Sequence, residues 1–343
     1  MQDDVVTRAI DALASRRDLD RAEAAAVLDE IMSGEVSEAQ IAAFLIAMRT
    51  KGETEEELAG LAETMRARAT RVAAERAELL DTAGTGGGRP TFNVSTTAAL
   101  IAAGAGATVA KHGNRSATGL SGSADLLEAL GARIDLAPDA VATCIREVGF
   151  GFMFAPDHHP ATRYVIPVRK SLGVRTIFNF LGPLTNPAGA TRQLVGVSDP
   201  AMAPVMAGAL ARLGAERALV VSSADGLDEM STSGPTEVIE VTGAATRSWT
   251  VSAADVGLDP APPEALRGGT PEQNADVTRR IFAGERGAQR DLAVLNAGAA
   301  LYAAGRAEPL EAAVRAAEQA VDSGAAGAAL DRFVARTREL AGG

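Results

Sequence analysis

The chain has 343 residues, which is enough for a large domain with a sizeable core and a smaller domain beside it. Its formal net charge of −11 argues against nucleic acid as its main partner, because nucleic-acid-binding proteins normally carry a basic face. A single cysteine excludes an internal disulfide and a cysteine-based zinc site, and it fits a reducing cytoplasm.

The first twenty residues begin with acidic side chains and contain no apolar core, so they do not resemble a signal peptide. The apolar stretch 41–48 is too short to cross a bilayer, which takes about 20 residues. We therefore expect a cytoplasmic protein whose partners are neither membranes nor nucleic acids.

Residues 1 to about 71 are predicted to form several short helices and no strand. Ser37, with Gln40 three residues later, predicts a capped helix over 38–48, and Thr54 with Glu57 predicts the next one. This part of the chain is expected to be a small helical domain.

From about Leu79 the pattern changes to β-like runs that end in polar or glycine-rich loops and are followed by helical stretches. The predicted strands are 107–110, 150–154, 217–221, 238–241 and an antiparallel addition at 246–251. From about Pro271 onward the chain is helical again. This alternation predicts a largely parallel sheet, whose ligand crevice lies beyond the carboxyl ends of the strands.

The first polar cluster is the glycine run 84–88, which is followed by Asn93, Ser95 and Thr96 at the expected start of a helix. Backbone N–H groups of such a loop, and those of the helix N-terminus, can bind a phosphate. The alternative is an ordinary turn with a Ser/Thr helix cap. The run matches neither a Walker A motif nor GxGxxG.

The second cluster, 111–116, directly follows a predicted strand and combines Lys111, His112, Asn114 and Arg115. Only three of the 33 basic residues are lysines, so a lysine at this point is notable. Lysine, asparagine, arginine and hydroxyl groups can together hold a multiply charged phosphate. The alternative is a solvated loop with a satisfied histidine.

The third cluster, 225–229, places Asp225, Asp228 and Glu229 after a predicted strand. Neighbouring carboxylates suit Mg²⁺, a hard cation that prefers oxygen ligands, although surface acidity is the alternative in an acidic chain. The fourth cluster, 155–186, contains arginines that could pair with a substrate carboxylate; the alternative is a hinge with surface charge.

These four clusters, in this order and spacing, resemble the anthranilate phosphoribosyltransferase family. The sequences KHGNRS at 111–116 and RTIFNFLGPLTNP at 175–187 are the most specific, and GGTPEQNA at 268–275 extends the resemblance. The resemblance implies an α/β fold of the nucleoside phosphorylase/phosphoribosyltransferase type. It implies a small all-α domain at 1–71, with a contribution from about 165–190, and a large domain at 72–343 with a mostly parallel sheet. It also implies a homodimer formed through the small domain.

The resemblance also assigns roles to individual residues. Positions that match binding of phosphoribosyl pyrophosphate are Gly84, Thr85, Gly86, Gly87, Asn93, Ser95, Thr96, Lys111 and Ser123. Positions that match binding of anthranilate are Gly113, Asn114, His159 and Arg169, with Arg169 facing the carboxylate. Positions that match the magnesium sites are Ser95, Asp228 and Glu229.

The chain departs from the family pattern in the glycine loop, which is one residue shorter and has Gly88 and Arg89 where an acidic residue is usual. Either this is an equivalent variant, or Arg89 assists the pyrophosphate. A milder departure is Arg163, with Tyr164 beside it, at a position that is sometimes aromatic.

The expected reaction joins the amine of anthranilate to ribose C1 of phosphoribosyl pyrophosphate and releases pyrophosphate. An aromatic amine demands no strong general base, so no catalytic acid or base is assigned, and the protein is expected to act by positioning and charge neutralisation. The alternatives are a pyrimidine nucleoside phosphorylase-like enzyme and a non-catalytic relative that binds nucleic acid.

Overall fold

The computed structural model describes residues 4–74, 78–116 and 119–342. Its first four helices are α1 (Val5–Ala14), α2 (Arg21–Ser33), α3 (Glu38–Lys51) and α4 (Glu55–Ala67). Both predicted capping boxes form, Ser37 with Gln40 and Thr54 with Glu57. Helix α3 is three residues longer than predicted, and Lys51 at its end pairs with the fully buried Glu57.

A single seven-stranded sheet forms the centre of the rest of the chain, in the order β3-β2-β1-β4-β5-β6-β7. The strands are β1 (Leu79–Gly84), β2 (Thr108–Gly113), β3 (Phe150–Phe154), β4 (Arg192–Gly196), β5 (Arg217–Ser223), β6 (Thr236–Thr242) and β7 (Ala245–Val251). The pairs among β1 to β5 are parallel, and β6 and β7 are added antiparallel. The prediction of a mostly parallel sheet is confirmed, although β1 and β4 were not among the predicted strands.

Helices connect and cover these strands. They are α5 (Val94–Gly104), α6 (Ser123–Ala129), α7 (Pro138–Val148), α8 (Ala155–His158), α9 (Ile166–Leu172), α10 (Phe178–Leu181), α11 (Ala203–Arg212), α12 (Pro271–Phe282), α13 (Ala288–Ala303), α14 (Leu310–Asp322) and α15 (Ala325–Ala341). Short 3₁₀ helices lie at Pro160–Tyr164, Gly182–Leu184, Pro200–Met202, Ala253–Val256 and Pro263–Leu266. The predicted loop after β3 therefore begins with a short helix.

Two hydrophobic cores lie on opposite faces of the sheet. Side chains alternate along a strand, so Leu219 and Val221 of β5 join the core under α5, α13 and α14, whereas Val220 joins the other core. This second core is continuous with the interior of the helical domain and also contains Val165 and Phe178. The two domains thus share one apolar layer.

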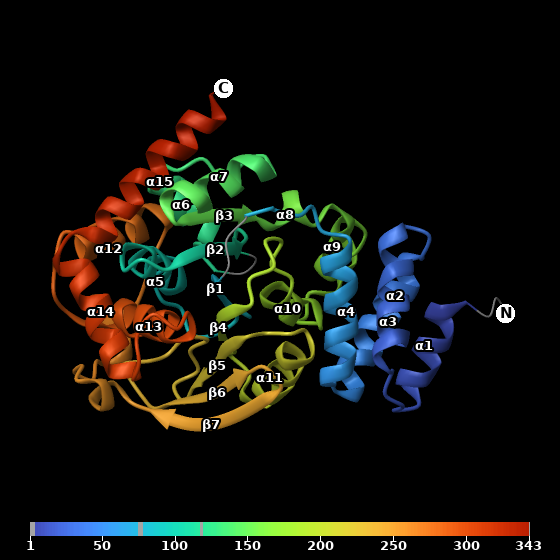
Figure 1. Ribbon diagram of the computed structural model, residues 1–343. Coiled ribbons are helices and arrows are strands. Elements are labelled where there is room, and N and C mark those ends of the chain that lie inside the picture. The colour runs from blue at the N-terminus through green and yellow to red at the C-terminus, as the bar shows by residue number, and fades with distance from the viewer. Residues whose placement is uncertain (1–3, 75–77, 117–118, 343) are drawn as a thin grey trace.

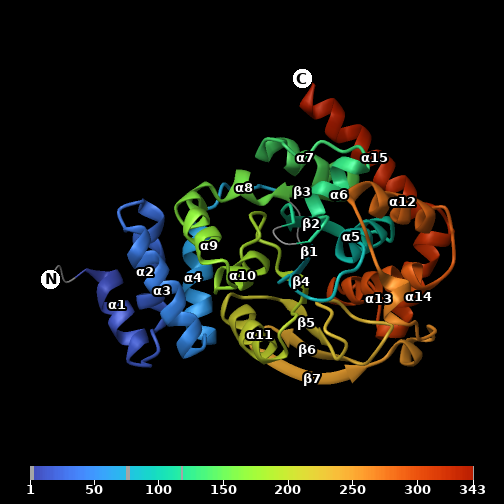
Figure 2. The same ribbon diagram turned by 180° about the vertical axis from the view of Figure 1, so that it is seen from behind.

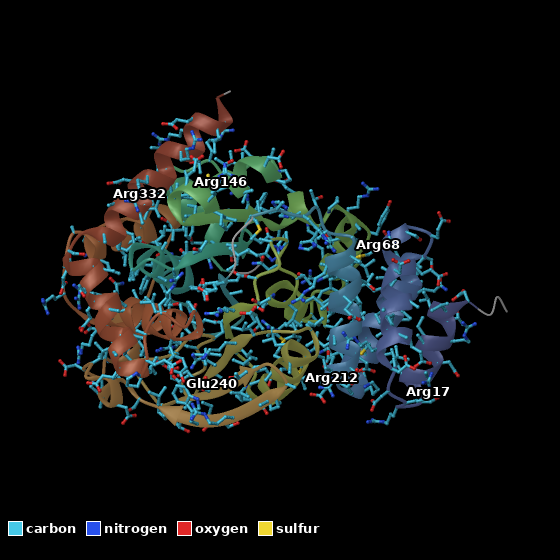
Figure 3. The ribbon with its side chains drawn as sticks, in the orientation of Figure 1. Arg17, Arg68, Arg146, Arg212, Glu240 and Arg332 are labelled. Atoms are coloured by element: carbon cyan, nitrogen blue, oxygen red, sulfur yellow. The ribbon has the colours of Figure 1, made fainter. Side chains whose placement is uncertain are left out.

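The helical domain stands at one side of the α/β domain in both views (Figures 1 and 2). Helix α4 packs on α11, and Arg212, which is labelled in Figure 3, lies at the end of α11. Arg212 pairs with Glu55 and Glu56 of α4. We propose that the two domains comprise residues 1–71 and residues 72–343. No helix in the described ranges is both long and apolar enough to cross a membrane.

Candidate active site

The sheet has a topological switch point between β1 and β4. From β1 the chain first adds β2 and β3 on one side, and it then returns to place β4 and β5 on the other side. Gly84 at the end of β1 pairs with Gly196 at the end of β4. In open α/β sheets this is where a crevice forms for a ligand, and the polar clusters of the sequence meet here.

The glycine loop after β1 is held from both sides. Gly86 and Gly87 have φ angles of 66° and 81°, which favour glycine. Arg175 donates from Nη1 to the carbonyl of Gly86 at 2.7 Å and from Nη2 to that of Thr85 at 3.1 Å. Ser198 Oγ also donates to the Gly86 carbonyl, at 2.8 Å. The sequence did not assign this role to Arg175, although it lies in the quoted motif 175–187.

Lys111 lies inside strand β2, not in the loop after it as the sequence suggested. Its side chain is buried, and Nζ donates to the carbonyl of Thr82 at 2.5 Å, to Thr82 Oγ1 at 3.1 Å and to Ser95 Oγ at 3.4 Å. Burial lowers the pKa of Lys111, while the negative charges of Asp81 and Glu229 act in the opposite direction. An anion at this point would stabilise the ammonium group.

Asp228 and Glu229 lie in the turn that follows β5. Asp228 Oδ2 accepts a hydrogen bond from the backbone N–H of Gly86 at 2.8 Å, and the Glu229 carboxylate accepts one from the N–H of Ser95. Burial, and secondarily the neighbouring charge of Asp228, raises the pKa of Glu229 to about 8, and burial raises the pKa of Asp228. The two carboxylates therefore lack sufficient positive charge around them.

This acidic pair fits a magnesium ion. Among the described residues there is no group of three His, Cys, Asp or Glu side chains that could hold a metal by themselves. Mg²⁺ does not need such a group, because it is usually bound by one or two carboxylates and completed by water and phosphate oxygens. A divalent cation would also supply the missing positive charge.

The residues at the start of α5 are held by a hydrogen-bond network. Asn93 precedes α5 but does not cap it with its side chain. Instead, Asn93 Oδ1 accepts from Ser121 Oγ and from Asn274 Nδ2, both at 2.8 Å. Asn274 is buried and belongs to the motif at 268–275, but no role was predicted for it. Thr96 is also buried, and its Oγ1 has no partner among the described residues.

The second half of the site lies beyond the ends of β2 and β3. Asn114 is exposed, and its carbonyl accepts a hydrogen bond from Ser123 Oγ at 3.2 Å. Gly113 lies directly beneath Ser123, because a Cβ on Gly113 would come within 2.1 Å of Ser123 Oγ. The guanidinium of Arg169 lies over the ring of Phe178, and no hydrogen bond or ion pair joins it to any described residue. Its guanidinium is thus available to a carboxylate.

His112 and His159 are buried with their ring centroids 5.0 Å apart. His112 Nδ1 lies 3.2 Å from the carbonyl of Gly182, and His159 Nε2 lies 3.1 Å from that of Thr185. Burial lowers the pKa of His112 to about 3 and that of His159 to about 4. Both rings are therefore neutral near pH 7.

The two neutral histidines predict an acid-sensitive fold. Below pH 6.5 the unfolded chain binds protons at these positions before the folded chain does, so stability falls as pH falls. Between pH 7.5 and 5.5 each histidine should lower the free energy of unfolding by about 1.4 kcal/mol. Urea unfolding at the two pH values should show a smaller loss for His112→Asn than for the original chain. Equal losses would contradict the neutral, buried state of His112.

Comparisons with known proteins agree with this geometry. The family model described as "Glycosyl transferase family, a/b domain" matches residues 76–327, and the one described as "Glycosyl transferase family, helical bundle domain" matches residues 7–69. The anthranilate phosphoribosyltransferase of Rubrobacter xylanophilus is 52% identical over 340 residues, which cover 98% of this chain and 99% of that one. The enzyme of the same name from Roseiflexus castenholzii is 55% identical over 320 residues, covering 92% and 94%.

Solved structures give the same result. The crystal structure of anthranilate phosphoribosyltransferase from Thermus thermophilus has a TM-score of 0.92 and 46% identity, covering 96% of this chain and 99% of that one. The Saccharomyces cerevisiae enzyme, solved in complex with phosphoribosyl pyrophosphate and Mg, has a TM-score of 0.89 and 26% identity, covering 97% and 98%. The likeness spans both domains at high identity, and the chain belongs to the anthranilate phosphoribosyltransferase family.

Proposed function

We propose that this chain transfers the phosphoribosyl group of phosphoribosyl pyrophosphate to the amine of anthranilate, with release of pyrophosphate, in tryptophan biosynthesis. The observation that carries the proposal is the grouping of Lys111, Ser95 and the pair Asp228–Glu229 around the glycine loop at the switch point. This grouping combines a buried cation, phosphate-binding backbone and carboxylates for a metal in one place.

The donor is proposed to lie along the glycine loop and the start of α5. Its proposed contacts are Gly84, Thr85, Gly86, Gly87, Asn93, Ser95, Thr96, Lys111 and Ser123. The free N–H groups at the N-terminus of α5 favour a phosphate group, and Lys111 supplies a full positive charge beside them. The pyrophosphate would then leave from a positively polarised surface.

Magnesium is proposed to bind through Asp228, Glu229 and the hydroxyl of Ser95. The yeast relative was solved with phosphoribosyl pyrophosphate and Mg, which supports the same requirement here. When bound, Mg²⁺ supplies positive charge that neutralises the departing pyrophosphate. The protein's own part is to hold the carboxylates in place, which the hydrogen bond from Gly86 to Asp228 achieves.

Anthranilate is proposed to bind against Gly113, Asn114, His159 and Arg169. The unpaired guanidinium of Arg169 can hold the carboxylate of anthranilate, and this orients the amine toward the donor. Attack of the amine on ribose C1 forms the new C–N bond while the bond from C1 to pyrophosphate breaks. The protein is thus proposed to accelerate the reaction by orienting the amine and by neutralising the charge of the departing pyrophosphate.

Replacing both acidic residues, Asp228→Ala with Glu229→Ala, should abolish turnover and leave folding intact. The raised pKa values indicate that the two carboxylates are not stabilised by the fold, so their loss should not unfold the chain. The measurement is the loss of anthranilate fluorescence with phosphoribosyl pyrophosphate and Mg²⁺, with circular dichroism as the folding control. Full activity in the double variant would refute the magnesium assignment.

Arg169→Ala should raise the KM for anthranilate by about 10- to 100-fold, because a charged hydrogen bond contributes about 1.5–3 kcal/mol. The KM for phosphoribosyl pyrophosphate should change little, since Arg169 contributes to the acceptor half of the site only. Lys170→Ala, which removes the exposed neighbouring charge, is the matched control. An unchanged KM for anthranilate would remove Arg169 from the acceptor site.

We further propose that two copies of the chain associate through the small helical domain. A mostly apolar hollow of about 410 Å³ lies between α1 and α3 and includes Ile10, Leu13 and the exposed Ile46. A second copy would cover this apolar surface. The cytoplasmic location stays a prediction.

Ile46→Glu should convert a dimer to a monomer in analytical ultracentrifugation, because it places a charge in the covered face. The change should leave each chain folded, since Ile46 is already partly exposed. If the original chain sediments as a monomer, or the variant as a dimer, this face is not the interface.

The nucleoside phosphorylase and nucleic-acid-binding alternatives are less well supported. The compared relatives are anthranilate phosphoribosyltransferases at about half identity over nearly the whole chain, and the net charge of −11 opposes a nucleic-acid partner. The same fluorescence assay tests the proposed function against both alternatives. Pure, folded protein that does not consume anthranilate would reopen both of them.

A further inference from the structure

We propose that Arg89 is a positioning residue, which aligns the acidic turn 225–229 against the glycine loop through its ion pair with Asp225. This inference deepens the proposed function and rests on it, because it assumes that Asp228 and Glu229 hold magnesium. It gives a role to a residue at which the sequence departs from the family pattern, and the role is not direct contact with pyrophosphate.

The contact between the two segments is short and partly shielded from water. Arg89 Nη2 lies 2.7 Å from Asp225 Oδ2, and the two side chains are 23% and 15% exposed. The backbone N–H of Arg89 also donates to the carbonyl of Gly226 at 3.2 Å. A shielded pair with a backbone bond beside it restrains geometry more strongly than an exposed surface pair.

Asp225 organises the turn that carries the acidic pair. Its Oδ2 also accepts from Ser231 Oγ at 2.7 Å, and its Oδ1 accepts from the N–H of Leu227 at 3.3 Å. The carboxylate therefore ties the beginning of the turn to the chain beyond it, and Asp228 lies between these two points. A shift of the Asp225 carboxylate would be transmitted to Asp228.

The glycine loop meets the same turn at a second point. The N–H of Gly86 donates to Asp228 Oδ2, and a Cβ on Gly88 would come within 2.8 Å of both Asp228 Oδ1 and the Gly226 carbonyl. The bonds from Arg89 to Asp225 and Gly226, and the bond from Gly86 to Asp228, thus join the loop to the turn on both sides of this close contact. The proposed phosphate-binding and magnesium-binding segments behave as one unit.

A direct contact between Arg89 and pyrophosphate is the competing explanation. Arg89 Nε and Nη1 are buried and have no hydrogen-bond partner among the described residues, so they could donate to an anion. The two explanations differ in what Asp225 does. If Arg89 works through Asp225, removing Arg89 has no further effect once Asp225 is gone. If Arg89 binds pyrophosphate itself, that contact remains in Asp225→Ala, and removing Arg89 as well adds to the loss.

The test is a double-mutant cycle of Arg89→Ala, Asp225→Ala and the double variant, read as the Mg²⁺ concentration for half activation and the KM for phosphoribosyl pyrophosphate. Arg89→Ala should raise both values about tenfold, the size expected for one charged hydrogen bond. Asp225→Ala should raise them at least as much, because it also removes the bonds from Ser231 and Leu227. The double variant should be no worse than Asp225→Ala alone, and the KM for anthranilate should stay unchanged.

Arg133→Ala is the matched control, because Arg133 forms a similar pair with Asp135 in which both side chains are more than half exposed. It should leave all constants unchanged. If either Ala variant fails to fold, Arg89→Lys and Asp225→Asn replace it in the cycle. A rise only in Arg89→Ala, additive effects, or no effect at all would each overturn the positioning role.

A failure of the proposed function would look different. In that case the original chain would not consume anthranilate. The cycle can then be read by calorimetric titration of phosphoribosyl pyrophosphate with Mg²⁺, where the same non-additive losses of affinity are expected. Retained affinity in Asp225→Ala would contradict the inference independently of the acceptor.

Discussion

The proposed active site depends on one buried ammonium group, that of Lys111. Taking a charge out of water is costly unless hydrogen bonds and opposite charges compensate for it. Three oxygens of Thr82 and Ser95 accept hydrogen bonds from it, and the negative charges of Asp81 and Glu229 oppose the effect of burial on its pKa. These groups come from β1, β2, the start of α5 and the turn after β5, so one cation fixes how four segments meet.

The sheet explains why these segments meet at this point. Because β1 lies between β2 and β4, chain segments that are far apart in sequence end side by side at its carboxyl end. The close approach requires glycine: a Cβ on Gly196 would lie 1.6 Å from the carbonyl of Asp228. Asp81 strengthens the same junction from inside the core, where Asn186 donates to it at 2.8 Å and the N–H of His112 at 3.1 Å. Packing and charge thus act on the same few residues.

Much of this arrangement could be predicted from local patterns. The caps at Ser37 and Thr54 depend on residues three apart, and β3 coincides with the predicted apolar run 150–154. Strand β4 was missed because 192–196 is short and begins with Arg and Gln. Lys111 was placed in a loop because a charged residue rarely lies within a buried strand. The roles of Arg175 and Asn274 depend on contacts with residues 89 and 181 positions away, which no local pattern contains.

The state of the two histidines bears on whether the reaction needs a base. His112 and His159 have pKa values near 3 and 4, so each is a weak base, and the fold holds both in the neutral form. A strong base would be needed only if the amine had to lose a proton before attack. An aromatic amine attacks as the neutral species, and its nitrogen becomes acidic only once the C–N bond forms, when a weak base or water can take the proton. The proposed site has neutral imidazoles on one side, and a buried ammonium group with two carboxylates for a metal on the other. Its charged groups therefore act on the leaving group and not on the nucleophile.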